Sequence, residues 1–496
     1  MMKFGDEFVD LGAPPALPPT SRAGQIEAVR RIWEWAGARL ARTEDKQDKR
    51  LVGQQYQLPQ ELIDAKFDDN PDDYFVLRGP AGTGKTFIMA EVVLALSAAG
   101  LKIAVGAPTN KAVGVIETKV QQAAKQRINA ATFKSVHSHV GLRMIETDEG
   151  EVQVSQGDFS DLNTYDIFIV DEGSMLDAQH QLRGIAGNRG QCIVLIVADF
   201  CQIPPVNSSG VSPAYHLPQW YELTEVVRQA EGNPIIQAAW NIRACMNMDD
   251  PERGDMPIHA SDLEEWLPGC MVRGVQKLNQ QIFERQRAGQ DARGIAYRNA
   301  AVGNMNDYVH YEMYPDCGSN KFCVGERVVV QSACRAVNAE TGRNEDLVTS
   351  EELMIMDVYQ DNHPIYERMG VYTMVVQDVR GVDYVVHVPR LMSAFNHAVN
   401  EKFNDVRDIK RQMGQRYDRS LQERYQAALR EAWGFKKAFA DIRLAYASTA
   451  HKIQGSTIFA SLVNYPDIMQ MRSDFERNRA LYVALTRPSD EIMIAY

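Results

Sequence analysis

Short apolar runs recur along the first part of the chain, and polar or charged residues follow each of them. The runs cover residues 74–77, 101–107, 166–170 and 192–198. Several of the stretches between them have the spacing of helices with one apolar face. Strands that alternate with helices are typical of a parallel α/β sheet, in which ligands bind at the carboxyl ends of the strands. We therefore expect a parallel α/β domain whose chemistry lies at that edge.

The segment before the first strand is mainly helical in pattern. Within residues 21–40, the apolar residues Ala28, Ile32 and Trp35 have the spacing of one buried helix face. Residues 42–73 are polar and charged, which predicts a loop with a short helix.

Residues 142–157 predict a β-hairpin with its turn at residues 148–150, Asp-Glu-Gly. The alternation of Met144 and Glu146 on one run, and of Val152 and Val154 on the other, suits a two-stranded ribbon. An isolated ribbon is only marginally stable, so we expect this one to lean on a core or on another domain. Its acidic turn should repel phosphate groups.

The pattern changes near residue 321. Residues 325–333, 370–379 and 381–390 are rich in β-forming residues, and the last two flank Arg380-Gly381 as a hairpin turn. A small barrel is the natural closure of such strands. Residues 396–444 are charged and mostly helical in pattern, and α/β signals then return. The sequence thus predicts a second α/β unit interrupted by an inserted β-and-helix domain.

The most informative stretch lies between the first strand and the helix after it. It has the GxxxxGKT pattern of a phosphate-binding loop in its required strand–loop–helix context. Its glycines allow backbone N–H groups to close around phosphates, and the helix N-terminus favours negative charge. Lys85 is expected on the β- and γ-phosphates, and Thr86 on Mg²⁺. The nucleotide-binding residues predicted here are Gly79, Pro80, Ala81, Gly82, Thr83, Gly84, Lys85 and Thr86.

Two acidic residues, Asp171 and Glu172, end the third apolar run, about 85 residues after Lys85. Nucleotide hydrolysis needs one carboxylate for the metal and a second to polarise water, so we assign Asp171 to Mg²⁺ and Glu172 to the general base. Gln202, after the next strand, is placed to sense the γ-phosphate.

Hydrolysis also needs positive charge at the transferred phosphate. Arg228 and Arg487 are the candidates, and an arginine in this role contributes about 10³–10⁵ in rate. A purely structural role is equally open for each of them.

Composition narrows the class of protein only slightly. The chain has 496 residues and a net charge of −12, which argues weakly against a nucleic-acid partner, although a local basic channel can overcome an acidic total. No apolar run has the length of a membrane span, and the N-terminus does not resemble a signal peptide. Seven cysteines without a CxxC pair predict reduced thiols and a cytoplasmic location.

Taken together, the motifs resemble those of superfamily 1 helicases, and specifically the 1B branch, with the Dda-type helicases of T-even-like phages nearest and RecD-like enzymes more distant. The matching stretches, in family order, are GPAGTGKT (79–86), APTNKAV (107–113), SVHSHVGL (135–142), VDEGSML (170–176), ADFCQIPPV (198–206), LTEVVRQ (223–229), AYRNAAVGNMN (296–306), ASTAHKIQGST (447–457) and LYVALTR (481–487).

This resemblance implies an ATP- and Mg²⁺-dependent DNA helicase that translocates 5′-to-3′ on single-stranded DNA and unwinds duplex DNA at forks. It also implies that Arg228 and Arg487 reach the γ-phosphate, and that Gln454 and Gly455 lie near the nucleotide. The DNA-contacting residues that it implies are Pro108, Thr109, Asn110, His137, Ser138, Thr449, His451 and Lys452.

The resemblance further implies the fold: α/β, with two RecA-like P-loop domains in tandem. The expected divisions are an N-terminal helical segment (1–73), a first RecA-like domain (74–230) with a hairpin or pin insertion (142–157), a second RecA-like domain (231–320 and 441–496), and an inserted SH3-like β domain with a helical extension (321–440). A phage source would place the protein in DNA replication or recombination in the host cytoplasm, with a single-strand binding protein or a replisome component as further partners and no membrane.

Two departures from the family pattern stand out. The family's adenine-contacting glutamine usually lies closer to the phosphate loop than Gln25 does, so either residues 42–72 are an insertion or Gln54, Gln55 or Gln60 takes the role. In addition, Gly173 stands where alanine or valine is usual, and Ala198 where glycine is usual.

Several alternatives stay open from the sequence. His137 and His139 suit a structural role as well as a functional one, and Trp433 and Phe435 suit core packing better than base stacking. The same motifs would serve a translocase that strips proteins from nucleic acid, or an RNA helicase.

Overall fold

The computed structural model describes residues 11–40, 60–65, 67, 70–124, 131–150, 152–157, 159–205, 210–225, 233–248, 254–317, 320–413 and 419–496. The chain forms two compact units. The first unit comprises Met1–Arg143, Val154–Arg273 and Ile453–Tyr496, and the second comprises Met144–Gln153 and Gly274–Lys452.

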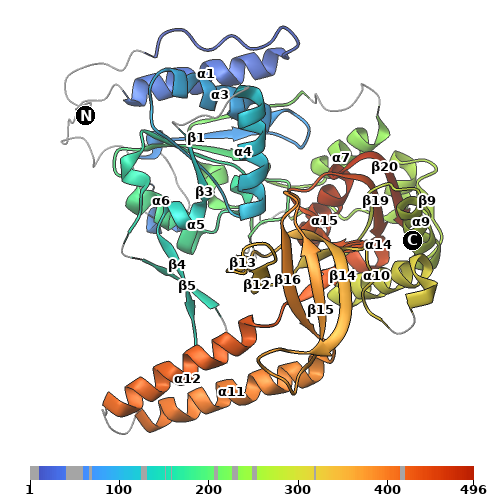
Figure 1. Cartoon of the computed structure of the whole chain (residues 1–496). Coiled ribbons are helices and arrows are strands. Elements are labelled where there is room, and N and C mark those ends of the chain that lie inside the picture. Colours follow the sequence, from blue (N-terminus) through green and yellow to red (C-terminus); the bar gives the residue numbers. More distant parts are fainter. Residues whose placement is uncertain are drawn as a thin grey trace. The chain divides into compact units, whose positions relative to one another are not determined.

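A six-stranded parallel sheet organises the first unit (Figure 1). Its order is β3 (Ala131–Ser135), β2 (Ile103–Ala107), β6 (Ile167–Val170), β7 (Ile193–Ala198), β1 (Tyr74–Arg78) and β8 (Trp220–Glu222). In register, Leu77 of β1 lies opposite Val197 of β7. The four apolar runs of the sequence form β1, β2, β6 and β7, and their residues are buried throughout.

Helices pack on both faces of this sheet, which explains why its strands are apolar without alternation. One core contains α1 (Ala23–Leu40), α3 (Lys85–Ala98) and α4 (Asn110–Ala124), and it includes Ala28, Ile32 and Trp35 as predicted. The core on the other face contains α2 (Gln60–Asp64), α5 (Val136–His139) and α6 (Arg183–Asn188). The arrangement brings the carboxyl ends of all the central strands to one edge.

The first unit also contains α7 (Pro234–Ala244), α8 (Ala260–Trp266), β9 (Met271–Val272), β19 (Ile458–Asn464), α14 (Tyr465–Ile468), α15 (Asp474–Thr486) and β20 (Pro488–Ala495). Strand β20 pairs in parallel with both β19 and β9. Residues 478–485 of helix α15 are all buried, and its Arg479 forms an ion pair with Asp255 at 2.7 Å.

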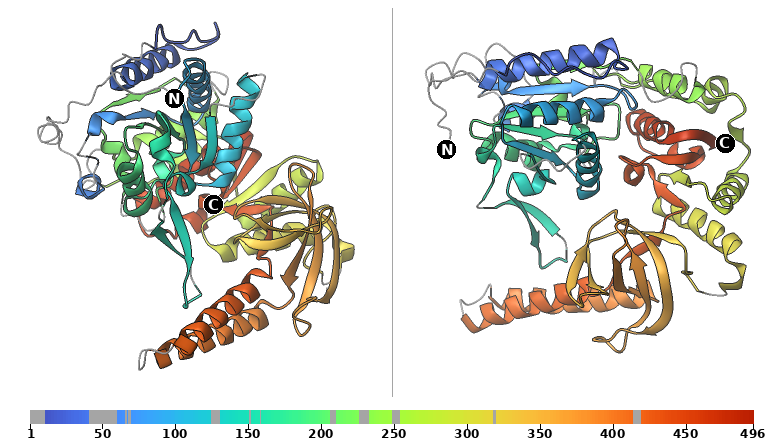
Figure 2. Two further views of the ribbon diagram at one scale, coloured as in Figure 1. Left: turned by 60° about the vertical axis from the view of Figure 1, so that its left-hand side comes forward. Right: turned by 45° about the horizontal axis from the view of Figure 1, so that its top comes forward.

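The second unit contains a seven-stranded sheet whose paired strands are antiparallel (Figure 2). Its order is β13 (Asn344–Leu347), β12 (Cys334–Asn338), β16 (Asp383–Pro389), β15 (Gly370–Gln377), β14 (Glu352–Asn362), β11 (Arg327–Val330) and β17 (Ile442–Leu444). The predicted turn at Arg380-Gly381 joins β15 to β16, with Gly381 at φ +83°.

A parallel strand pair, β10 (Ala292–Ala296) and β18 (Ala447–Thr449), belongs to the same unit, with α9 (Val275–Arg287), α10 (Asn299–Met313) and α13 (Ala450–Ile453). The α/β pattern therefore stops before the inserted strands and returns after them, as the sequence indicates.

Two long helices, α11 (Met392–Met413) and α12 (Arg419–Lys437), run side by side from the inserted sheet (Figures 1 and 2). Their shared core contains Phe403, Val406 and Trp433. Trp433 and Phe435 are both buried, so the prediction that they serve core packing is correct.

The predicted hairpin forms as β4 (Leu142–Glu146) and β5 (Val152–Gln156). Its tip belongs to the second unit and contacts the helical pair: Trp433 Nε1 donates to Thr147 O at 3.0 Å, and Lys436 Nζ donates to Gly150 O at 2.7 Å. An added Cβ at Gly150 would lie 3.2 Å from the Phe403 ring. The hairpin therefore does lean on the inserted domain.

The expectation of an acidic, phosphate-repelling tip needs correction. Asp148 pairs with Lys410 at 2.6 Å, and Glu146 pairs with Lys437, so much of the negative charge is compensated. The side chains of Met144 and Val152 lie outside the described part of the structure.

The expectation that all cysteines are reduced also needs correction, because Cys317 and Cys323 are joined in a disulfide. The other five cysteines are free. His310, near this disulfide, contacts Glu326 at 2.8 Å and the Asn320 carbonyl at 3.0 Å. The hydrogen bond to Glu326 raises the pKa of His310.

Among the described residues, no helix combines the length and the apolarity that crossing a membrane would require.

Candidate nucleotide-binding and hydrolysis site

The phosphate-binding loop connects β1 to α3, and two glycines permit its path. Gly82 and Gly84 have φ +84° and +86°, which side chains disfavour, and Gly84 is the N-cap of α3. An added Cβ at Gly79 would lie 2.9 Å from Thr83 Oγ1 and 3.0 Å from Leu223. Lys85 begins the helix, and its Nζ donates to the carbonyls of Gly79 at 2.7 Å and Pro80 at 2.9 Å. The loop thus holds its lysine over the site.

The acidic pair follows β6 directly. Glu172 has φ +53°, a left-handed conformation that costs a non-glycine residue about 1–3 kcal/mol and that occurs most often at functional sites. Its backbone N–H donates to Asp171 Oδ1 at 2.9 Å. Burial and, to a smaller extent, the negative charge of the neighbouring Asp171 together raise the pKa of Glu172 to about 7. Burial also raises the pKa of Asp171.

Lys85 of the phosphate loop interacts electrostatically with three carboxylates. Burial lowers the pKa of Lys85, while the charges of Asp199, Glu172 and Asp171 act in the opposite direction. An oxygen donor set of hydroxyl and carboxylate, Thr86 with Asp171, suits a hard divalent cation such as Mg²⁺. The residues present therefore fit the predicted metal, which would lower the cost of two buried carboxylates.

Gln202 lies after β7, where its Nε2 donates to Asp199 Oδ2 at 3.3 Å. Its Oε1 is buried and has no hydrogen-bond partner among the described residues. Because buried polar atoms are normally satisfied, this oxygen suits a group that arrives with the substrate, such as an attacking water. The geometry is compatible with the sensor role predicted for Gln202.

Arg487 caps the C-terminus of α15 and is largely buried. Its Nη2 contacts Thr486 Oγ1 at 3.1 Å, and its charge lowers the pKa of Glu172. Arg487 therefore lies within electrostatic range of Glu172. Arg228, the second predicted arginine, lies outside the described residues.

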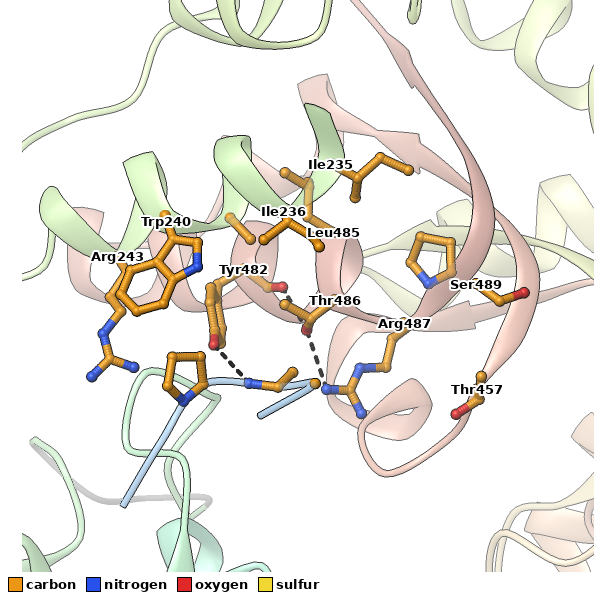
Figure 3. A pocket seen from close by; sticks show the side chains of 15 residues that line it. Ile235, Ile236, Trp240, Arg243, Thr457, Tyr482, Leu485, Thr486, Arg487 and Ser489 are labelled. Carbon is orange, nitrogen blue, oxygen red and sulfur yellow. Dashed lines mark hydrogen bonds between the residues drawn. The ribbon is translucent and has the colours of Figure 1, made fainter. Parts of the chain in front are cut away.

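A cavity of about 220 Å³ adjoins the phosphate loop within the first unit (Figure 3). The loop forms one wall, α7 supplies an apolar wall with Trp240, and α15 supplies a third with Arg487. The lining residues are Pro80, Ala81, Gly82, Ile235, Ile236, Ala239, Trp240, Arg243, Thr457, Tyr482, Leu485, Thr486, Arg487, Pro488 and Ser489.

Gln25, the predicted adenine reader, is buried against the phosphate loop. Its Nε2 donates to Thr83 O at 3.2 Å, and it is so close to Gly84 that a Cβ there would overlap it. Gln60 instead bonds Asp64 on the surface, and Gln54 and Gln55 lie outside the described residues. The long spacing in sequence therefore does not keep Gln25 from the loop, although it does not line the cavity.

Gly455, the glycine predicted near the nucleotide, lies beside Glu172. An added Cβ at Gly455, which has φ +78°, would lie 3.8 Å from Glu172 Oε1. Gln454 donates to Ile203 O at 3.4 Å, close to the segment of Gln202.

Packing explains why a glycine stands at position 173, one of the two departures from the family pattern. A Cβ at Gly173 would overlap Ile196 and lie 3.3 Å from the Cβ of Ala198. Position 173 therefore has no room for a side chain, chiefly because Ile196 already occupies the space.

The DNA-contact residues predicted in the first unit follow β2 and β3. Thr109 and Asn110 are exposed at the start of α4, and Thr109 Oγ1 accepts the Ala112 N–H at 3.2 Å. Ser138 is exposed in α5, while His137 contacts Gln181 at 3.4 Å. These segments share the sheet edge that carries the phosphate loop, because the strands are parallel.

His139 has the structural role. It is fully buried, with Nδ1 at 2.9 Å from Asp161 Oδ1 and Nε2 at 3.3 Å from Val105 O.

Thr449, His451 and Lys452 belong to the second unit, at the end of β18 and in α13. Thr449 is largely buried, and its Oγ1 accepts the Lys452 N–H at 3.4 Å. His451 and Lys452 are exposed, and Lys452 Nζ donates to Gln331 Oε1.

Sequence reasoning missed Asp199, Tyr482 and Trp240 as parts of this site. Asp199 and Tyr482 stand inside the recognised motifs ADFCQIPPV and LYVALTR, so they could have been selected there. Trp240 lies on an ordinary helix, and the sequence carries no signal for its position at the cavity.

The geometry on its own fits a P-loop nucleoside-triphosphatase. The phosphate loop, the acidic pair and the buried Gln202 follow neighbouring strands of one parallel sheet, and Arg487 lines the cavity beside the loop. The comparisons with known proteins refine that class. Residues 51–249 match a family model described as an AAA domain. The chain is 23% identical over 434 residues to the ATP-dependent DNA helicase dda of Enterobacteria phage T4, covering 84% of this chain and 92% of that protein. It is 30% identical over 192 residues to the ATP-dependent RecD2 DNA helicase of Deinococcus radiodurans, covering 38% of this chain and 24% of that one.

Two solved structures match this chain over most of its length, with low TM-scores. Two coordinating Pif1 helicases at forked DNA give a TM-score of 0.46 with 17% identity, covering 88% of this chain and 92% of that one. Pif1 helicase from Candida albicans gives a TM-score of 0.42 with 14% identity, covering 88% of this chain and 93% of that one. The chain is an ATP-hydrolysing helicase, and it is similar to superfamily 1B helicases of the Dda-type and RecD-like group. The parallel α/β sheets fit the tandem RecA-like fold of this class.

Proposed function

We propose that this helicase uses ATP and Mg²⁺ to move 5′-to-3′ along single-stranded DNA and to unwind forked duplex DNA. The observation that carries the proposal is the shared sheet edge, where the phosphate loop and acidic pair follow β1 and β6, and exposed polar residues follow β2 and β3. A change at the nucleotide therefore has a short path to the segments proposed to hold DNA. The direction of movement is taken from the family resemblance.

In the proposed hydrolysis step, Lys85 and the loop amides hold the β- and γ-phosphates. Mg²⁺, held by Thr86 and Asp171, would neutralise phosphate charge. Glu172 takes a proton from the attacking water, which Gln202 orients. Arg487 and Arg228 stabilise the negative charge that develops in the transition state.

Gln25, Gln454 and Gly455 complete the proposed nucleotide site. Gln25 bonds the loop carbonyl of Thr83 and retains hydrogen-bonding capacity on its amide for the base. Gly455 lies beside Glu172 and so adjoins the proposed catalytic carboxylate.

The residues proposed to contact DNA are, in the first unit, Pro108, Thr109, Asn110, His137 and Ser138. In the second unit they are Thr449, His451 and Lys452. Contacts of this kind, to phosphates and stacked bases, would be sensitive to salt and tolerant of sequence.

We propose the domain divisions given by the resemblance: an N-terminal helical segment (1–73), RecA-like domains at 74–230 and at 231–320 with 441–496, and an SH3-like β domain with helical extension at 321–440. The hairpin at 142–157 acts as the pin that separates strands. Its braced tip supports unwinding over simple translocation, because a wedge has to resist force.

The biological setting is also a proposal. A phage helicase of this type would act in DNA replication or recombination in the host cytoplasm, with a single-strand binding protein or replisome component beside it.

ATP hydrolysis, measured with no nucleic acid, with single-stranded DNA and with single-stranded RNA, tests the nucleic-acid part of the proposal. We expect strong stimulation by DNA and weak stimulation by RNA, with Lys85→Ala as the inactive control. Stronger stimulation by RNA would favour an RNA helicase, and no stimulation would overturn the proposal.

A further inference from the structure

The hydroxyl of Tyr482 joins the phosphate loop to a strand end inside the first unit. Tyr482 is buried in α15, and its oxygen accepts the N–H of Ala81 at 3.2 Å. The same hydroxyl donates to Asp199 Oδ2 at 2.9 Å. One side chain thus contacts the loop between β1 and α3 and the end of β7 (Figure 3 shows the bond to the loop).

Asp199 extends this connection to the predicted γ-phosphate sensor. Its carboxylate is buried and accepts Gln202 Nε2 at 3.3 Å and the Cys201 N–H at 3.3 Å. Arg243 Nη1 lies 4.0 Å from it. Because Tyr482 and Gln202 share the oxygen Oδ2, a shift of one changes the position available to the other.

On its other side, the connection leads to Arg487. Thr486 Oγ1 donates to the Tyr482 carbonyl at 2.8 Å, and Arg487 Nη2 lies 3.1 Å from the same Thr486 oxygen. Tyr482 is therefore fixed to the loop at its hydroxyl and to the arginine through one turn of helix.

We infer that Tyr482 is a positioning residue for ATP hydrolysis, which holds Arg487 and Gln202 in register with the phosphate loop. This inference rests on the proposed function of the site. Tyr482 touches neither the transferred phosphate nor the water in this account. Its contribution is geometric: small displacements of positioned groups cost large factors in rate.

Tyr482→Phe keeps the ring and removes both hydrogen bonds. We expect kcat for DNA-stimulated ATP hydrolysis to fall by about tenfold or more, with KM for ATP changed by less than about twofold, because the loop amides and Lys85 still hold the phosphates. The matched control is Tyr74→Phe, which removes a buried hydroxyl from a charged partner, Arg189 Nε at 2.9 Å, at the opposite end of β1. This control should retain kcat even if urea unfolding shows a similar loss of stability.

A double-mutant cycle with Arg487→Ala separates positioning from general damage. If Tyr482 acts in part through Arg487, the loss of kcat in the double variant should be clearly smaller than the product of the two single losses, because Arg487→Ala has already removed one of the two groups that Tyr482 positions. Additive losses, or an unchanged kcat in Tyr482→Phe, would overturn the inference. If Tyr482→Phe does not fold, Asp199→Asn serves in the same cycle with the same expectation. A wild-type protein without DNA-stimulated ATPase would instead contradict the proposed function.

Discussion

The side-chain amide of Gln25 donates a hydrogen bond to the carbonyl of Thr83, 58 positions further along the chain. A helix at the start of the described chain therefore contributes directly to the phosphate loop. The amide keeps one N–H beyond this bond, and Oε1 accepts the Arg22 N–H at 3.1 Å.

Because Gln25 contacts the phosphate loop, substituting it tests whether it contributes to nucleotide recognition. We expect Gln25→Ala to raise KM for ATP and to reduce the preference for ATP over GTP, because the loop loses a hydrogen bond and the base loses an amide partner. Steady-state kinetics with both nucleotides measure the effect. Gln60→Ala, which removes a surface amide bonded to Asp64, is the control and should behave as wild type.

A raised pKa at Glu172 predicts the pH dependence of the reaction. Burial and Asp171 raise this pKa to about 7, and a general base works only when it is deprotonated. Activity should therefore be lost as pH falls through about 7, which the acid limb of kcat/KM for the free enzyme reports. Glu172→Gln should abolish turnover while ATP still binds. An acid limb near the ordinary glutamate pKa would remove Glu172 from this role.

Substitution of Lys85 and substitution of Arg487 should have different effects on the kinetics of ATP hydrolysis. Lys85→Ala removes the cation that holds the phosphates, so DNA-stimulated turnover should disappear while the circular dichroism spectrum is retained. Arg487→Ala should lower kcat by about 10³ with a smaller change in ATP affinity, since its charge matters chiefly in the transition state. Turnover near the wild-type value in either variant would exclude that residue from the mechanism.

The hydrogen bond between Trp433 and the hairpin tip predicts that its loss affects fork unwinding but not DNA-stimulated ATP hydrolysis. Trp433→Phe keeps an aromatic ring in the core of α11 and α12 but cannot donate to Thr147 O. We expect DNA-stimulated ATPase to stay near the wild-type rate while fork unwinding slows several-fold.

Replacing residues 145–153 with a short Gly-Ser turn should have a larger effect of the same kind. If unwinding survives this replacement, the hairpin is not the wedge. If ATPase is lost as well, its role is structural. Tyr359→Phe, on an exposed face of β14, controls for aromatic substitution in the second unit.

The central strands and the phosphate loop could be predicted because their signals are local. Residues 74–77 are apolar over their whole length, and residues 79–86 carry a complete motif, so neighbours in sequence suffice. The helical pattern around Ala28 and Ile32 is local in the same way, and these residues are buried as expected.

The features that could not be predicted depend on residues far apart in the chain. The charge of Asp148 is compensated by Lys410, and the position of Tyr482 depends on Ala81 and Asp199. A pattern within one segment cannot report such partners. The disulfide between Cys317 and Cys323 was missed for a different reason, since an odd cysteine number without framework spacing favours free thiols.

The most direct test of the account is strand displacement on forked DNA, comparing a 5′ single-stranded tail with a 3′ tail under single-turnover conditions. We predict ATP-dependent displacement from the 5′-tailed substrate and little from the 3′-tailed one, with none in Lys85→Ala. Displacement that requires the 3′ tail would contradict the proposed direction. Robust DNA-stimulated ATPase without displacement from either substrate would contradict unwinding itself.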